Sequence, residues 1–163
     1  MFGTEVFQEQ ESIEEFCEKI KAGKEALRTD EFMIIARVES LILEQGMDDA
    51  LKRAFAYVNA GASGIMIHSC KKEPTEIFEF CDKFREVEKD VPIVVVPTSY
   101  NKVTEKDLAD HGINIVIYAN QLTRSAFPAM KNTAVNILTN HSAGEVDSEL
   151  MPFKEIIALI DEI

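Results

Sequence analysis

Four short apolar runs, each ending in polar residues, constrain the fold of this chain more than any other feature. The runs are FMIIARVES (32–40), GIMIHS (64–69), PIVVVPTS (92–99) and INIVIYAN (113–120). Unbroken apolar character over a few residues favours strands buried on both faces, as in a parallel sheet covered by helices. Segments with a helical spacing of apolar residues separate the runs. The pattern therefore predicts four βα units.

We expect one domain over residues 1–163, with a lead-in helix at 11–23, four βα units over 32–140 and a last helix at 151–163. An eightfold (β/α) barrel needs roughly 200 residues or more, so this chain holds about half of one. The predicted fold class is α/β: half of a (β/α)₈ TIM barrel, with four parallel strands, each followed by a helix, and flanking N- and C-terminal helices. An open doubly wound sheet is the alternative, although no GxGxxG or Walker motif supports nucleotide binding.

The polar residues that end the runs meet at the carboxyl-terminal edge of a parallel sheet, where such folds place their ligand chemistry. Arg37 offers a planar guanidinium that fits carboxylate or phosphate, with structural pairing to Glu39 as the alternative. His68 holds the equivalent place in the next run, either as a hydrogen-bond or acid–base group or as a satisfied core residue. We expect Arg37 and His68 to carry the chemistry. Substrate-binding or supporting roles are predicted for Glu39, Ser69, Thr98 and Asn120, with helix capping as the alternative for Thr98 and Asn120.

Charge and composition exclude several classes of partner. A formal net charge of −12 argues against nucleic acid and anionic membrane surfaces. No run approaches the roughly 20 apolar residues of a membrane span, and the first residues lack a signal-peptide pattern. The three cysteines show no CxxC spacing, so we expect reduced thiols in a cytoplasmic protein. Only Glu39 offers a carboxylate at the rim, so we predict no metal site built from this chain alone.

Several segments resemble a known family in order and spacing. ARVES (36–40), AYVNAGASGIMIHS (56–69) and VPIVVVPTSY (91–100) resemble the C-terminal half of the phosphoenolpyruvate mutase family, in the isocitrate lyase superfamily. SIEEFCEKIKAGK (12–24) is similar to the family's helix before the fifth barrel strand. Carbon–carbon lyases of the superfamily usually carry an acidic residue where this chain has His68. The pairing of arginine and histidine is similar instead to the mutase and to phosphonopyruvate hydrolase.

The resemblance implies a Mg²⁺-dependent isomerase that interconverts phosphoenolpyruvate and phosphonopyruvate in phosphonate biosynthesis. By motif, Arg37 would hold the substrate and His68 would be its partner in the active site. The implied ligands are small phosphorylated or phosphonate C3 acids. Phosphonopyruvate hydrolase and a carbon–carbon lyase of the same superfamily are the alternative activities.

The family's metal-binding aspartates and gating loop lie on its first four strands, and nothing in this chain matches them. We therefore expect a truncated product or a half-barrel that another chain completes, with weak Mg²⁺ binding and little or no turnover alone. A non-catalytic half-barrel that persists by oligomerising is the alternative from another class. The family exchanges its last barrel helix between subunits, which would make 121–140 an interface helix. Pairing of the edge strands 32–37 and 113–118 would also give a homo-oligomer.

Overall fold

A computed structural model describes residues 8–29 and 31–159 of the chain. The chain divides into two compact units, Met1–Ala119 and Asn120–Ile163. Among the described residues, the first unit contains the sheet and four helices, and the second contains helices and no strand. The expectation of a single domain over residues 1–163 stays a prediction.

The first unit is built on a parallel sheet whose strand order, β1-β2-β3-β4, follows the sequence. Its strands are β1 (Ile35–Val38), β2 (Gly64–Ile67), β3 (Ile93–Val95) and β4 (Ile115–Val116). Each strand lies beside its neighbour in the chain, which is the arrangement of a (β/α) barrel rather than of a doubly wound sheet. The prediction of a half-barrel with β1 and β4 at its edges is confirmed.

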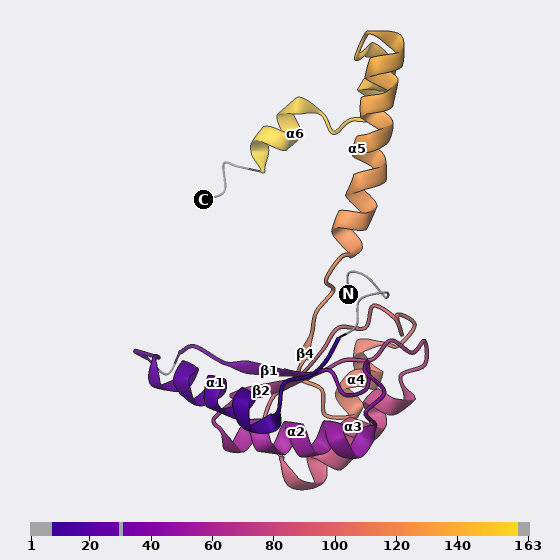
Figure 1. Ribbon diagram of the computed structural model, residues 1–163. Coiled ribbons are helices and arrows are strands. Elements are labelled where there is room, and N and C mark those ends of the chain that lie inside the picture. Colours follow the sequence, from indigo (N-terminus) through magenta and orange to yellow (C-terminus); the bar gives the residue numbers. More distant parts are fainter. Residues whose placement is uncertain (1–7, 30, 160–163) are drawn as a thin grey trace. The chain divides into compact units, whose positions relative to one another are not determined.

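The helices of the first unit lie along one face of the sheet, as Figure 1 shows for α1 to α3. Their bounds are α1 (Ile13–Glu25), α2 (Met47–Asn59), α3 (Thr75–Val87) and α4 (Glu105–Asp110). α2 contacts α1, α3 and the first two strands. The starts of α1 and α4 follow from local chemistry, because Ser12 with Glu15 and Thr104 with Asp107 form capping boxes.

The hydrophobic core lies between the sheet and these helices. Along β1, Ala36 and Val38 are buried while Arg37 between them is exposed. On β4, Ile115 keeps 41% of its surface exposed. The expectation of strands buried on both faces therefore fails for the edge strands β1 and β4, whereas all three residues of β3 are buried. Only one face is covered by helices, and in a complete barrel the opposite face packs against side chains from the other strands.

The strands are also shorter than the apolar runs that predicted them. β1 begins at Ile35, and Phe32 and Met33 ahead of it are exposed. Arg37 consequently lies within β1 and not after its end. Pro92 precedes β3, as expected of a residue that has no N–H to give to the ladder.

The second unit begins with α5 (Gln121–Asn140), which has the predicted bounds. Between α5 and the last helix lies a 3₁₀ helix, η1 (Gly144–Glu149), which contacts α5 and buries Val146. α6 spans Phe153–Ala158, and the last predicted residues of this helix lie outside the described part of the chain. Large apolar side chains on α5 and α6 are exposed. In the described ranges, no helix has the length and apolar character needed to cross a membrane.

Candidate active site

The sheet register brings Arg37 and His68 to one face. Arg37 is in register with Met66, and His68 follows Met66 by two residues, directly after β2. Because side chains alternate along a strand, Arg37, Met66 and His68 point to the same side of the sheet. That side is opposite the helices, since the alternate residues Ala36 and Val38 are the buried ones. The two residues predicted to carry the chemistry thus lie on the open face.

Arg37 forms an ion pair with Glu39, to which its Nε donates. The arginine side chain is 47% exposed and the glutamate side chain 30% exposed. An ion pair exposed to this degree adds little stability, because water screens it and two long side chains lose freedom in forming it. The guanidinium keeps further N–H groups for a ligand. Glu39 therefore holds Arg37 in place without using up its donors.

His68 is partly buried, and its Nδ1 has no hydrogen-bond partner among the described residues. Burial, followed by the positive charge of Arg37, holds the pKa of His68 below its ordinary value, and Glu39 opposes the shift. The imidazole is therefore neutral at pH 7, with one nitrogen able to donate and the other able to accept.

Ser69 lies away from this pair. It is fully buried, donates to Glu76 of α3 and accepts from the backbone N–H of Lys71 at 3.0 Å. These bonds stabilise the turn between β2 and α3. Glu76 also pairs with Lys71, so the serine belongs to a local structural network.

Thr98 and Asn120 follow β3 and β4. The backbone N–H of Thr98 donates to Val96 O at 2.7 Å, which marks a tight turn after β3. Asn120 is the N-cap residue of α5 and makes no capping bond through its side chain. The described geometry of the first unit thus gathers Arg37, Glu39 and His68 at one place.

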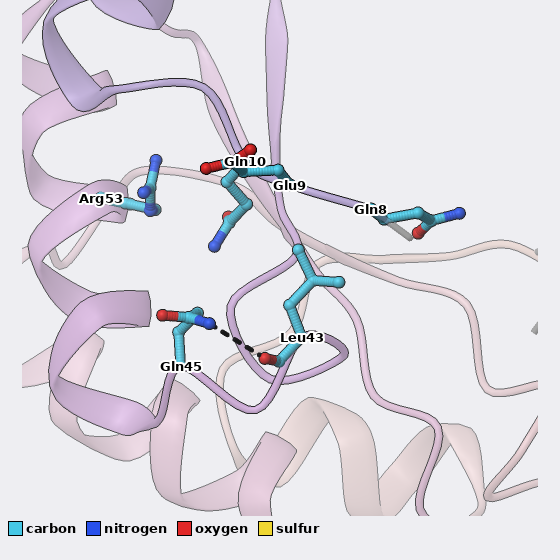
Figure 2. A pocket seen from close by; sticks show the side chains of 6 residues that line it. All are labelled: Gln8, Glu9, Gln10, Leu43, Gln45 and Arg53. Atoms are coloured by element: carbon cyan, nitrogen blue, oxygen red, sulfur yellow. Dashed lines mark hydrogen bonds between the residues drawn. The ribbon is translucent and has the colours of Figure 1, made fainter. Parts of the chain in front are cut away.

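A cavity adjoins Arg37 and Glu39. It has a volume of about 220 Å³, and its other walls include Leu43, Tyr57 and the segment 8–11 that precedes α1. A second cavity, of about 380 Å³, shares Gln8, Glu9, Gln10 and Leu43 with the first. Figure 2 shows Gln10, Gln45 and Arg53 around this second space, with Gln45 Nε2 donating to Leu43 O at 3.2 Å.

The sequence reasoning missed a polar network behind these cavities. Asp49 Oδ2 accepts from Ser40 Oγ at 2.7 Å and from Arg53 Nε at 2.9 Å. Arg53 Nη1 also donates to Glu11 O at 2.8 Å and to Tyr57 Oη at 3.1 Å. Burial alone would raise the pKa of Asp49, but the bonds from Ser40 and Arg53 outweigh it and hold the pKa below its usual range. The i,i+4 spacing of Asp49 and Arg53 was the available signal.

The described residues do not fit a magnesium site. Over residues 8–29 and 31–159, no three or more His, Cys, Asp or Glu side chains gather where they could hold a metal ion. Glu39, the carboxylate nearest the candidate pair in sequence, is engaged by Arg37. A hard Mg²⁺ ion prefers several oxygen ligands, often carboxylates. We therefore derive no chemical step through a metal ion held by these residues.

Comparison with known proteins places this geometry in a family. A family model described as phosphoenolpyruvate phosphomutase matches residues 4–138. The phosphoenolpyruvate phosphomutase of Tetrahymena pyriformis is 39% identical over 155 residues, which cover 95% of this chain and 51% of that protein. The phosphonopyruvate hydrolase of Variovorax sp. (strain Pal2) is 42% identical over 153 residues, covering 93% and 52%.

The fold gives the same assignment. A crystal structure of phosphonopyruvate hydrolase in complex with oxalate and Mg²⁺ matches with a TM-score of 0.85 at 41% identity, over 98% of this chain and 55% of that one. The chain spans about half the length of the relatives it matches. The family model, the curated relatives and the solved structure agree, and the chain belongs to the phosphoenolpyruvate phosphomutase family.

Proposed function

We propose that this chain is the C-terminal portion of a phosphoenolpyruvate mutase-like enzyme, and that Arg37 and His68 bind its substrate, a small phosphorylated or phosphonate C3 acid. The observation that carries the proposal is the placement of a half-exposed guanidinium and a neutral imidazole on the open face of a parallel sheet, at the carboxyl end of β2. Curated relatives named for phosphoenolpyruvate and phosphonopyruvate chemistry support the ligand class.

Arg37 is the anion-binding group in this account. A guanidinium presents parallel N–H donors that match two oxygens of a carboxylate or of a phosphoryl group. On binding, the substrate anion accepts from the N–H donors of Arg37 that Glu39 leaves free, and Glu39 keeps Arg37 oriented.

His68 is the neutral hydrogen-bond group in this account. Transfer of a phosphoryl group spreads negative charge over its oxygens, and positioned donors stabilise that charge. A neutral imidazole donates one hydrogen bond to such an oxygen without adding a second full positive charge beside Arg37. The lowered pKa of His68 supports this protonation state at pH 7.

Mg²⁺ belongs to the proposal as a cofactor of the assembled enzyme. A phosphonopyruvate hydrolase that is 41% identical to this chain was solved with Mg²⁺ and oxalate. Bound Mg²⁺ would neutralise charge on carboxylate and phosphoryl oxygens. Its ligands would be carboxylates outside residues 8–29 and 31–159, because those residues gather no suitable group.

Sequence identity does not separate the two activities, since the mutase relative is 39% identical and the hydrolase relative 42% identical. We place the mutase first and the hydrolase second. A carbon–carbon lyase comes third, because His68 stands where the resemblance gives those lyases an acidic residue. The isolated chain is expected to turn over little or nothing, since it supplies four of the eight strands of a barrel.

Nuclear magnetic resonance tests the binding site directly. Titration of the chain with phosphonopyruvate should shift the Arg37 Nε–H and His68 ring signals, and Arg37→Ala should abolish the shift at His68. Arg28→Ala, which changes an exposed arginine after α1, is the matched control and should leave the titration unchanged. Shifts confined to other residues, or an unchanged response in Arg37→Ala, would refute the proposed site.

A second candidate function is a non-catalytic module that oligomerises. It is favoured by β1 and β4, which lie at the edges of the sheet that the described residues form, and by the exposed apolar residues Ile115 and Ile117. A homodimer would form by closure of two half-barrels or by exchange of α5. Sedimentation equilibrium over a dilution series should then give a dimer or larger species. A folded monomer of 18.3 kDa at micromolar concentration would rule out both routes.

The two candidates differ in their response to ligand. A catalytic half-barrel should gain thermal stability from phosphoenolpyruvate with Mg²⁺, because binding to the native state favours folding by mass action. The non-catalytic module should show no such gain.

A further inference from the structure

Two chain segments form the wall of the candidate site, and hydrogen bonds link both of them to one carboxylate. The turn between β1 and α2 carries Glu39, Ser40 and Leu43, and the segment 8–11 precedes α1. Both segments line the 220 Å³ cavity beside Arg37. Neither is part of a helix or strand, so their positions depend on the bonds that anchor them.

The turn is anchored through Ser40. This serine is fully buried, and its hydroxyl donates to Asp49 Oδ2 at 2.7 Å. Two backbone bonds close the same turn, from Leu43 N to Glu39 O at 3.0 Å and from Gln45 N to Ser40 O at 2.8 Å. Ser40 directly follows Glu39, the residue that pairs with Arg37. A shift of this turn would therefore move the carboxylate that orients the arginine.

The segment before α1 is anchored through Arg53. The arginine side chain is only 12% exposed, and it bonds both Asp49 Oδ2 and Glu11 O. Gln10 Nε2 reaches Ser40 Oγ at 3.5 Å, which joins the two segments a second time. Asp49 thus accepts a hydrogen bond from each anchor, Ser40 and Arg53. Hydrogen bonds that involve a charged group are among the stronger ones in a protein.

We propose that Asp49 is a positioning residue for the Arg37–His68 site, because its carboxylate holds both walls of the adjoining cavity, the β1–α2 turn through Ser40 and the segment 8–11 through Arg53. The inference rests on the proposed function only where it calls this place a substrate site. Asp49 touches neither Arg37 nor His68 in its hydrogen bonds and acts through Ser40 and Glu39.

Amide hydrogen exchange and side-chain signals in Asp49→Asn test the coupling without any ligand. Exchange at Leu43 and Gln45 should become roughly tenfold faster relative to Ile65, whose N–H bonds Pro92 O in the core. The Arg37 Nε–H and His68 ring signals should shift as well. Glu79→Gln is the matched control, because it breaks another i,i+4 ion pair, on α3, and should move none of these signals.

Two results would overturn the inference. If exchange at Leu43, Gln45 and Ile65 rises by the same factor, Asp49 contributes only to global stability. If the turn loosens while the Arg37 and His68 signals stay in place, the turn does not position the site.

Ser40→Ala keeps the inference testable if Asp49→Asn fails to fold. It removes one neutral donor and leaves the pair of Asp49 and Arg53 intact, so exchange at Leu43 should rise while Phe16 N, bonded to Ser12 O after the segment 8–11, stays protected. Equal changes at Leu43 and Phe16 would contradict the proposed division of roles. Failure of phosphonopyruvate to bind the unmodified chain would refute the proposed function and leave this coupling standing.

Discussion

Arg37 of β1 is the register partner of Met66 of β2. His68 follows Met66 on the same side of the sheet, so the register places the guanidinium and the imidazole on one face. Neither Ala36 nor Val38 competes for that side, because both are buried under the helices. The proposed chemistry follows from this relationship, and the first prediction concerns the charge that one residue exerts on the other.

Arg37→Gln should raise the pKa of His68. Burial is the largest influence that lowers this pKa, and it remains in the variant, but the positive charge of Arg37 is removed. Glu39→Gln should lower the same pKa further, because Glu39 opposes the shift. A pH titration of the His68 ring protons measures both effects. Arg28→Gln should leave the titration unchanged, and a His68 pKa indifferent to Arg37 would contradict the described arrangement.

The lowered pKa of His68 also predicts how stability depends on pH. In the unfolded chain a histidine takes up its proton near a pKa of about 6.5, whereas folded His68 does so at lower pH. Between these values the unfolded state binds more protons, so the free energy of unfolding falls as pH drops. His68→Gln should show a shallower decline below pH 6.5 in denaturant titrations. An equal slope in both proteins would show that His68 has the same pKa folded and unfolded.

Gly112→Ala should destabilise the chain more than Gly46→Ala. Both glycines have positive φ, +74° and +90°, so each alanine costs about 1–3 kcal/mol in backbone strain. A Cβ at Gly112 would also meet Arg85 Nε at 2.7 Å, whereas a Cβ at Gly46 would meet nothing within 4 Å. The difference in unfolding free energy should be about 1 kcal/mol or more, from disturbed Arg85 bonds. Equal losses in the two variants would disprove the close contact.

Arg85→Lys tests the same contact by changing the arginine instead of the glycine. Its guanidinium donates to Gly112 O through Nη2 at 2.6 Å, to Val91 O at 2.7 Å and to Asn114 Oδ1 at 2.7 Å. A lysine cannot reproduce this fork, so the free energy of unfolding should fall by about 2 kcal/mol. Arg28→Lys at an exposed position should change it by less than about 0.5 kcal/mol. Matching chemical denaturation curves for Arg85→Lys and the unmodified chain would exclude this structural role.

The sequence predicted which helices and strands form better than it predicted the residues at which they begin and end. Apolar runs located the strands and the helical spacing of apolar residues located the helices, because both signals are local. The apolar runs predicted strands longer than those observed. An apolar side chain such as Phe32 extends the run although it is exposed and lies ahead of β1. Whether a strand is covered on one face or two depends on the partners of the sheet, which local periodicity does not report.

The candidate site was also predictable only in part. Arg37 and His68 were predictable because each comes at or near the end of an apolar run, and parallel strands bring such ends together. The network of Ser40, Asp49 and Arg53 was missed, because its members come from a turn and a helix and their contact is tertiary. Ser69 carried a strand-end signal equal to that of His68, yet its hydroxyl is occupied by Glu76. The two side chains point in different directions, and the pattern of residue types does not predict those directions.

The central claim is that Arg37 and His68 belong to the active site of an enzyme of which this chain supplies one half. The most direct measurement is phosphonopyruvate conversion after mixing the chain with the separately expressed N-terminal half of the Tetrahymena pyriformis relative, in the presence of Mg²⁺. The account predicts activity in the mixture, its loss with Arg37→Ala or His68→Ala, and its retention with His141→Ala, which changes an exposed histidine. Full activity in a mixture that contains Arg37→Ala would contradict the account.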